Sequence, residues 1–304
     1  MKHAIPLATN RAIFSALLLL HAAALFALPA LHAAPIVWLT LLTAMLWLTI
    51  VHWGLIHEAI HKLLFPDARA NELGGRALAI AMGTSFHVLR FGHLMHHQWN
   101  RQFHSERDIA PTFTGRIYYY AHLLLGVYAM EVVASWLFLF LPRAQFMWLA
   151  HRTFLHDAPH VAATGERFFY VRGNIHETRT DVAIGLVLYG LAFALSGGQF
   201  LWLAAFVLLR AIVISFMDNI YHFDTPTDNS KLGKELSLPP LVSALMLHGN
   251  YHETHHANPD VPWRELPATH VMQHRAFDGD FVTHGLKQFK GPDWDELTIA
   301  TATA

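Results

Sequence analysis

The 304-residue sequence contains no cysteine. This absence excludes disulfides, thiolate metal sites, iron–sulfur clusters and cysteine nucleophiles. Charged residues are also scarce, at 14% against about 25% in a typical soluble domain. Together with 54% hydrophobic residues and a mean hydropathy of +0.30, this scarcity indicates a membrane protein. The net charge of −1 offers no strongly basic surface, so nucleic acid is not an expected partner.

Four apolar stretches are expected to cross the bilayer, whose hydrocarbon core is about 30 Å thick. They are residues 12–33, 35–56, 182–197 and 200–217. Only a short turn separates the members of each pair, which predicts two helical hairpins. The first stretch resembles a secretory signal because basic residues precede it, but it is longer than the apolar part of such signals and a second span follows at once. We therefore expect an uncleaved first span.

Lysine and arginine are distributed unevenly between the loops. The turns after residue 33 and around residue 198 contain neither, whereas the segments 57–116, 142–181 and 218–304 contain many. The positive-inside rule places these three segments in the cytoplasm. The fifth apolar stretch, 117–141, then makes no net crossing and is expected to be re-entrant or to lie at the membrane surface. A true fifth span is the alternative.

These patterns predict the fold class: an all-α integral membrane protein, with residues 1–304 in a single domain. Four transmembrane helices form two hairpins, and a cytoplasmic helical cap, made by residues 57–116 and 218–304, holds nearly all the polar chemistry. We expect a multi-pass membrane protein with these polar segments in the cytoplasm.

Histidine is abundant, with 24 copies, and many lie three or four residues apart. Such spacing places side chains on one face of a helix. The clusters are His57 and His61, then His93, His96 and His97, and then His252, His255 and His256. His248 precedes the third cluster by one helical turn, and Asp218 and His222 are four residues apart at the end of the fourth span. So many imidazoles at helical spacing predict metal binding.

The number of histidines indicates more than one ion. A catalytic zinc takes three protein ligands, whereas eight or nine histidines supply two ions with four or five each. Imidazole binds iron, copper and zinc alike, so the ligand type does not name the metal. The sequence "HEAIH" also fits the H-E-x-x-H motif of zinc proteases, but that interpretation leaves the other two clusters unexplained. A metal transporter would need ligands along a transmembrane path, whereas these clusters lie at the ends of the predicted spans and in the predicted cytoplasmic segments.

The three clusters, in this order and between these spans, resemble the three histidine boxes of the integral-membrane fatty acid desaturase/hydroxylase superfamily. Asn100 and Asp108 after the second cluster resemble the continuation of that box in the family. The sequence "ANPDVPWRELP" after the third cluster resembles the proline-rich exit of the third box. The resemblance covers roughly residues 12–270.

The resemblance implies a non-haem di-iron centre that uses O₂ as co-substrate. The ligands it implies are His57, His61, His93, His96, His97, His222, His252, His255 and His256. For an additional ligand or a neighbouring polar group, the candidates are His248, Asp218, Asn219, Glu58 and Asp108. Glu106 and Glu253 are further carboxylates that could accept the outer N–H of a ligand histidine.

For activity, the resemblance implies desaturation of a fatty acyl chain carried by a lipid, by CoA or by an acyl carrier protein. An acetylenase, or a hydroxylase or ketolase that acts on acyl, alkane or carotenoid substrates, is the alternative, and a zinc protease is a remote one. No cytochrome b5 or ferredoxin module is fused to the chain, so a separate electron donor of one of these types is expected.

Arg210 lies midway along the fourth predicted span, where a charge is costly. Three roles are open for it. The guanidinium pairs with Glu131, binds an anionic part of the substrate, or extends into a wet cavity.

Overall fold

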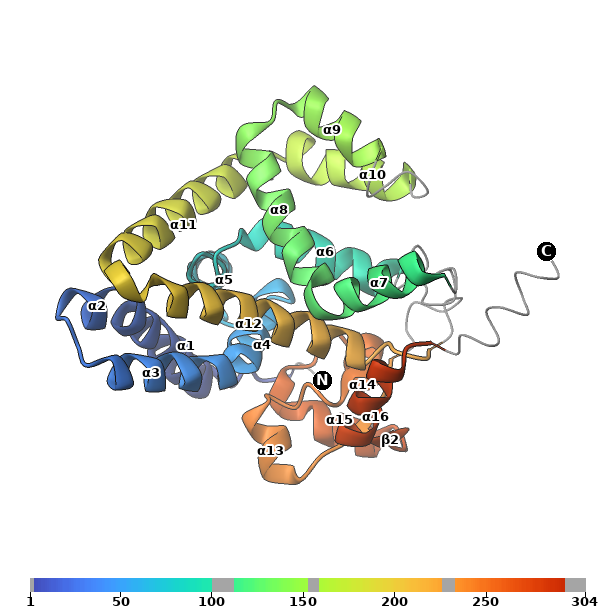
Figure 1. The fold of residues 1–304 in the computed structure, drawn as a ribbon. Helices are drawn as coiled ribbons and strands as arrows, with labels where there is room; N and C mark the ends of the chain where they lie inside the picture. The colour runs from blue at the N-terminus through green and yellow to red at the C-terminus, as the bar shows by residue number, and fades with distance from the viewer. Residues whose placement is uncertain (1–2, 100–111, 153–158, 226–232, 293–304) are drawn as a thin grey trace. The chain divides into compact units, whose positions relative to one another are not determined.

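The computed structural model describes residues 3–99, 112–152, 159–225 and 233–292 (Figure 1). These residues are mostly helical. The only strands among them, β1 (Leu236–Ser237) and β2 (Gly279–Asp280), form a short parallel pair. The chain divides into two compact units. The first unit contains residues 4–95 and 129–210, and the second contains residues 1–3, 96–128 and 211–304.

The first unit is built from apolar and amphipathic helices. Its elements are α1 (Leu7–Ala22), the π-helical η1 (Ala23–Ala27), α2 (Leu28–Ala30), α3 (Pro35–Trp47), α4 (Thr49–Ile60), α5 (Ala68–Met82), most of α6 (Phe86–Trp99), most of α8 (Val127–Phe140), α9 (Arg143–Arg152), α10 (Pro159–Glu166), the π-helical η4 (Arg167–Val171), α11 (Asn174–Ser196), the 3-10 turn η5 (Gly197–Gln199) and the first half of α12 (Phe200–Ile220).

The second unit contains the shorter elements. They are the last turn of α6, α7 (Phe113–Ala121), the π-helical η3 (His122–Gly126), the second half of α12, β1, α13 (Pro240–Leu245), α14 (His252–Ala257), the 3-10 turn η6 (Trp263–Glu265), α15 (Leu266–Met272), β2, α16 (Phe281–Lys287) and the 3-10 turn η7 (Gln288–Lys290).

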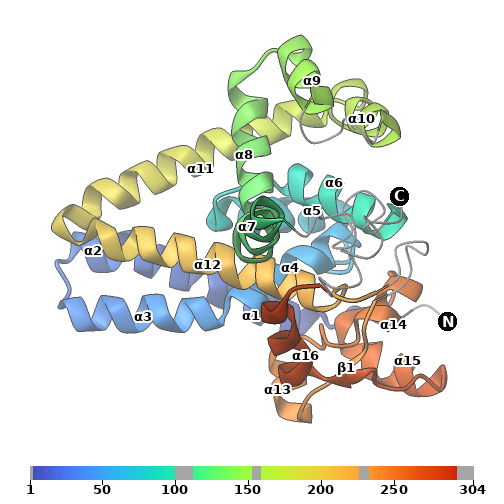
Figure 2. The same ribbon diagram turned by 45° about the vertical axis from the view of Figure 1, so that its right-hand side comes forward.

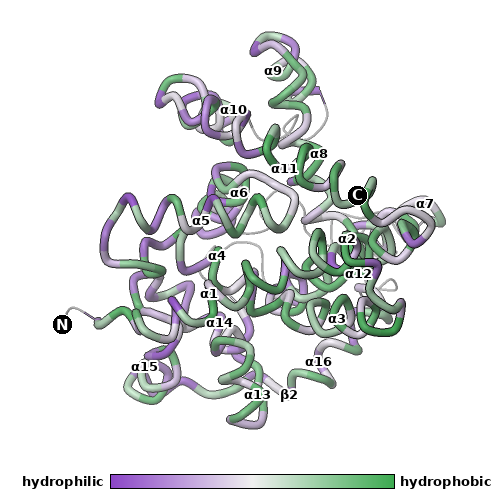
Figure 3. The backbone as a smooth tube through the Cα atoms, turned by 90° about the vertical axis from the view of Figure 1, so that its left-hand side faces the viewer, coloured by the Kyte–Doolittle hydropathy of each residue, from purple (hydrophilic) through white to green (hydrophobic). Residues whose placement is uncertain are grey.

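Two stretches of the described residues are long and apolar enough to cross a membrane, Leu7–Ala30 and Asn174–Ile220. Two bent pairs pass the same test when each is taken together: α3 with α4, bent by 48°, and α7–η3 with α8. The described residues therefore hold two candidate spans, or four if each bent pair is one span. Figure 3 shows that α3 and α12 are coloured mainly as hydrophobic, whereas α10 contains more hydrophilic residues.

The candidate spans agree in position with the predicted apolar stretches. Residues 12–33 and 35–56 correspond to α1–α2 and to α3–α4, and the break predicted near residue 198 is η5, where the chain turns sharply between α11 and α12 (Figures 1 and 2). Helix α11 begins at Asn174, about two turns earlier than the predicted span. The two-hairpin topology, the re-entrant segment and the cytoplasmic cap stay predictions.

Arg210 is buried in α12, with 1% of its surface exposed. Its Nη2 donates hydrogen bonds to the carbonyl oxygen of Met82 at 2.7 Å and to the hydroxyl oxygen of Tyr189 at 2.9 Å. The guanidinium carbon also lies 5.1 Å from the ring centroid of Phe206. These contacts join α12 to the end of α5 and to α11. Full burial does not fit an extension of this side chain into water, whereas pairing with Glu131 and binding of substrate stay predictions.

Close packing at Gly75 brings three helices of the first unit together. A Cβ atom at this position would lie 2.5 Å from the ring of Phe86 and 2.9 Å from the Cβ of Ala59. Nearby, the side chain of Asn71 donates to the carbonyl oxygen of Ala59 at 2.8 Å and accepts from the backbone N–H of Leu64 at 3.1 Å. The position of α5 therefore sets how α4 and α6 approach each other.

We expect Gly75→Ala to lower the thermal unfolding midpoint of the purified protein. Alanine favours a helix over glycine by about 1 kcal/mol, but the added methyl group overlaps three packed atoms, and such overpacking costs about 1–3 kcal/mol. Gly190→Ala in α11 is the matched control, because no atom lies within 4 Å of a Cβ there, and it should leave the midpoint unchanged or raise it. Equal midpoints for the two variants would contradict the packing argument.

Candidate metal centre

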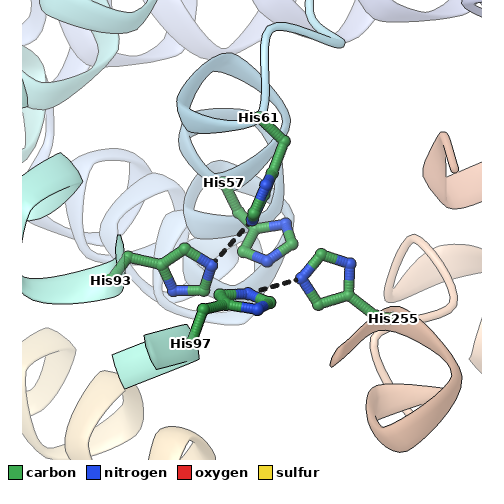
Figure 4. A group of neighbouring side chains, drawn as sticks. All are labelled: His57, His61, His93, His97 and His255. Carbon is green, nitrogen blue, oxygen red and sulfur yellow. Dashed lines mark hydrogen bonds between the residues drawn. The ribbon is translucent and has the colours of Figure 1, made fainter. Parts of the chain in front are cut away.

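Three histidines gather within the first unit. His57 lies in the last turn of α4, His61 directly follows that helix, and His93 lies on α6. The Nε2 atoms of His61 and His93 are 2.9 Å apart, and the ring centroids of His57 and His93 are 4.5 Å apart (Figure 4). One ring nitrogen of each lies within 4.8 Å of the others. The spacing that the sequence shows therefore places the first cluster beside one member of the second.

The end of α4 explains where His61 lies. Lys62 has a φ of 65°, its N–H donates to the carbonyl oxygen of Ala59 at 3.1 Å, and the N–H of Leu63 donates to the carbonyl oxygen of Glu58 at 2.7 Å. This pattern is a Schellman motif, in which a left-handed residue ends the helix. The helix consequently ends at Ile60 with His61 as its C-cap, and the rings of His57 and His61 lie 4.9 Å apart between centroids.

Four other histidines gather within the second unit. One ring nitrogen from each of His96, His222, His252 and His256 lies within 4.8 Å of the others. The Nε2 atoms of His96 and His256 are 3.1 Å apart, and those of His222 and His252 are 2.8 Å apart. Helix α6, the turn that follows α12 and helix α14 supply these side chains. The lone histidine after the fourth apolar stretch thus joins the second and third clusters.

A histidine pair completes the set in the second unit. The Nε2 atoms of His97 and His255 are 3.0 Å apart, and both rings belong to described helices, α6 and α14 (Figure 4). The ring of His97 also stacks on His256 with a centroid distance of 4.2 Å. Burial lowers the pKa of His97 to about 4. This imidazole is therefore neutral near pH 7, the form in which histidine binds a metal.

Glu235 holds helix α14 in place, and the sequence alone did not single it out. Its carboxylate is fully buried and accepts hydrogen bonds from both the backbone N–H, at 2.6 Å, and the hydroxyl of Thr254. The same carboxylate lies 3.5 Å from Nδ1 of His270. Burial raises the pKa of Glu235. Because Thr254 lies between His252 and His255, these bonds fix the helix that presents three imidazoles.

The candidate His248 does not belong to either group of close ligand atoms among the described residues. The prediction that His248 lies one turn before the third cluster on the same helix face was wrong, because α14 begins at His252 and the left-handed φ values of Leu247 and His248, 50° and 53°, take the chain out of the helix. The Nδ1 of His248 instead forms a hydrogen bond with the hydroxyl of Ser243 at 2.8 Å.

The carboxylate and amide candidates lie outside the histidine groups or contact other residues. Among the described residues, neither Glu58, which is buried in α4, nor Asp218 belongs to either group of close ligand atoms. Asn219 donates to the side-chain oxygen of Gln288 at 2.7 Å, and Glu253 forms an ion pair with Arg275 at 2.8 Å.

The remaining candidates of the second box, Asn100, Glu106 and Asp108, lie outside the described residues.

Comparison with known families gives one result. The family model described as fatty acid desaturase matches residues 31–285, which include all nine histidines. No curated protein and no solved structure matches the chain.

Loss of the Glu235 carboxylate should destabilise the third histidine cluster. We expect Glu235→Ala to lower the thermal unfolding midpoint, because it leaves the buried N–H and hydroxyl of Thr254 without their acceptor, at a cost of about 1–3 kcal/mol. Glu235→Gln keeps an acceptor oxygen and should retain part of the stability. Glu253→Gln is the control and should have little effect, since an ion pair near the surface contributes about 0–1 kcal/mol. A thermal shift of equal size in all three variants would refute this role.

Proposed function

The chain belongs to the fatty acid desaturase family, and we propose that it is an O₂-dependent di-iron oxidoreductase of the membrane that introduces a double bond into a fatty acyl chain. The observation that carries this proposal is the gathering of imidazole nitrogens from all three histidine boxes into groups of close ligand atoms. A zinc protease needs only the first box and one further ligand, so it leaves most of these groups without a purpose.

The donor set fits iron. Among the described residues, the two groups of close ligand atoms consist of histidines alone, and imidazole is a good ligand for iron as well as for zinc and copper. In our assignment, one iron would be held by His96, His222, His252 and His256. The histidines of the first unit, His57, His61 and His93, would contribute to holding the other.

Helix α6 supports this division. His93 belongs to the first unit and His96 to the second, and at three residues' spacing their side chains leave the helix about 60° apart around its axis. One helix thus supplies ligands to both irons. Neutral imidazoles add no negative charge, so this donor set leaves the positive charge of the metals uncompensated.

A pair of irons bound in this way would activate O₂, the oxidant for removal of hydrogen from an unactivated CH₂, with two electrons from a separate donor. The protein's own part is to place the acyl chain and to keep its ligands rigid. We propose that an apolar tunnel holds the chain in one pose, so that two neighbouring carbons face the metals. Glu235 keeps α14, and with it His252, His255 and His256, in a fixed orientation.

The partners follow from the same assignment. We propose a substrate whose acyl chain is carried by a lipid, by CoA or by an acyl carrier protein, and electrons from a separate ferredoxin or cytochrome b5-like protein. The active site would face the cytoplasm of a bacterial cell, on the side to which the positive-inside rule assigns the histidine-bearing segments.

Metal analysis tests the assignment. After anaerobic loading of the purified protein with ferrous iron, we expect two irons per chain. His96→Ala and His57→Ala should each lower this content, because each removes a ligand from one iron, whereas His248→Gln should not. One zinc per chain, or equal iron loss in the His248 variant, would contradict the assignment.

Product analysis tests the reaction. With O₂, reductant and an electron donor, mass spectrometry of products from a panel of acyl substrates should show the loss of two hydrogens. His252→Ala should abolish that product. Gain of an oxygen atom instead would assign the protein to the hydroxylases, and loss of four hydrogens to the acetylenases.

A further inference from the structure

Helix α16 and the adjoining turn η7 expose three large apolar side chains. Val282, Leu286 and Phe289 are 60%, 59% and 50% exposed, and their spacing of four and three residues places them on one face. Among the described residues, neither element belongs to a candidate span. An apolar face of this size outside the spans needs a partner.

The segment α16–η7 also packs against the end of a candidate span. A Cβ at Gly285 would lie 2.9 Å from the side chain of Ile220, the last residue of α12. The ring of Phe289 stacks on Phe216 with a centroid distance of 5.3 Å, and the buried Gln288 side chain accepts the hydrogen bond from Asn219. Residues 216–220 form the last turn of α12, so α16–η7 lies at the depth where that span ends.

Helix α7 holds the same segment from a second side. The hydroxyls of Tyr119 and Tyr120 donate to the backbone carbonyl oxygens of Gln288 and Phe289, each at 2.9 Å. Helix α7 belongs to a bent pair that is itself a candidate span, and its own Tyr118 is exposed. Tyrosine is enriched where a membrane meets water. Two membrane-associated elements therefore flank α16–η7.

Two lysines border the exposed apolar face. Lys287 and Lys290 are both exposed, and no acidic residue occurs between Asp280 and Asp293. Apolar side chains on one face of a helix with lysines beside them are typical of segments that lie in the interface of a bilayer. Basic side chains at that level attract anionic headgroups.

We propose that α16 and η7 form an interfacial anchor. Val282, Leu286 and Phe289 enter the boundary between headgroups and acyl chains, and Lys287 and Lys290 bind the phosphate groups of anionic phospholipids. The bilayer that surrounds α12 is the partner, because the anchor is attached to the last turn of that span. The proposal does not depend on metal binding or on catalysis.

Spin labelling tests the anchor in the full-length protein, and the absence of native cysteine makes single-site labelling clean. Leu286→Cys, labelled with a nitroxide and reconstituted in nanodiscs that contain phosphatidylglycerol, should be several-fold more accessible to O₂ than to a water-soluble nickel complex. Leu201→Cys, on the exposed surface of α12, provides the lipid reference, and Asp260→Cys provides the aqueous reference. Unchanged circular dichroism controls for folding.

Two results would overturn the proposal. A label at residue 286 that is as accessible to nickel as the Asp260 label would place this face in water. A label that neither reagent reaches would show that protein, a second copy or another chain, covers the face.

Charge removal tests the lysines separately. In the Leu286→Cys background, Lys287→Gln with Lys290→Gln should lower the ratio of O₂ to nickel accessibility in nanodiscs that contain phosphatidylglycerol, down to the value in pure phosphatidylcholine. Arg264→Gln, which removes a positive charge elsewhere in the second unit, is the matched control and should leave the ratio unchanged. An equal ratio in both lipids before any lysine is replaced would refute binding of anionic headgroups.

Discussion

Imidazole rings pack as closely as they do here only while no more than one ring of each pair is protonated. Within each unit, the structure places ring nitrogens of histidine pairs 2.8–3.1 Å apart. Two protonated rings at such a distance would repel strongly, the more so because burial weakens screening by water. Burial itself favours the neutral form, as the lowered pKa of His97 shows. The state that allows the rings to meet is also the one in which they bind a metal.

Local periodicity predicted much of the site. The spacing within "HEAIH", "HLMHH" and "HETHH" requires only that each segment be helical, and α4, α6 and α14 provide those helices. His222 was predicted as a ligand through the resemblance to the family, since it lies directly after the fourth apolar stretch. The apolar stretches could be predicted because their hydrophobicity is a property of the local sequence. The family match over residues 31–285 confirms the resemblance that the boxes indicated.

Features that depend on distant contacts could not be predicted. His248 has the right spacing for the third cluster, but two left-handed residues interrupt the helix before His252; Gly249 and Asn250, which separate His248 from the cluster, are the signal of that break that spacing alone passes over. Glu235 lies far from the boxes in the sequence and becomes important only because the chain returns to Thr254. Arg210 carries an obvious charge, yet its bonds to Met82 and Tyr189 come from helices that only tertiary packing brings near.

Helix α6 carries His93, His96 and His97 within little more than one turn, and in the proposed assignment it serves both irons. Binding of the first iron would restrain the rotation of this helix about its axis. Binding of the second iron would then cost less conformational entropy. The two ions should then load cooperatively, with singly occupied protein scarce at every iron concentration.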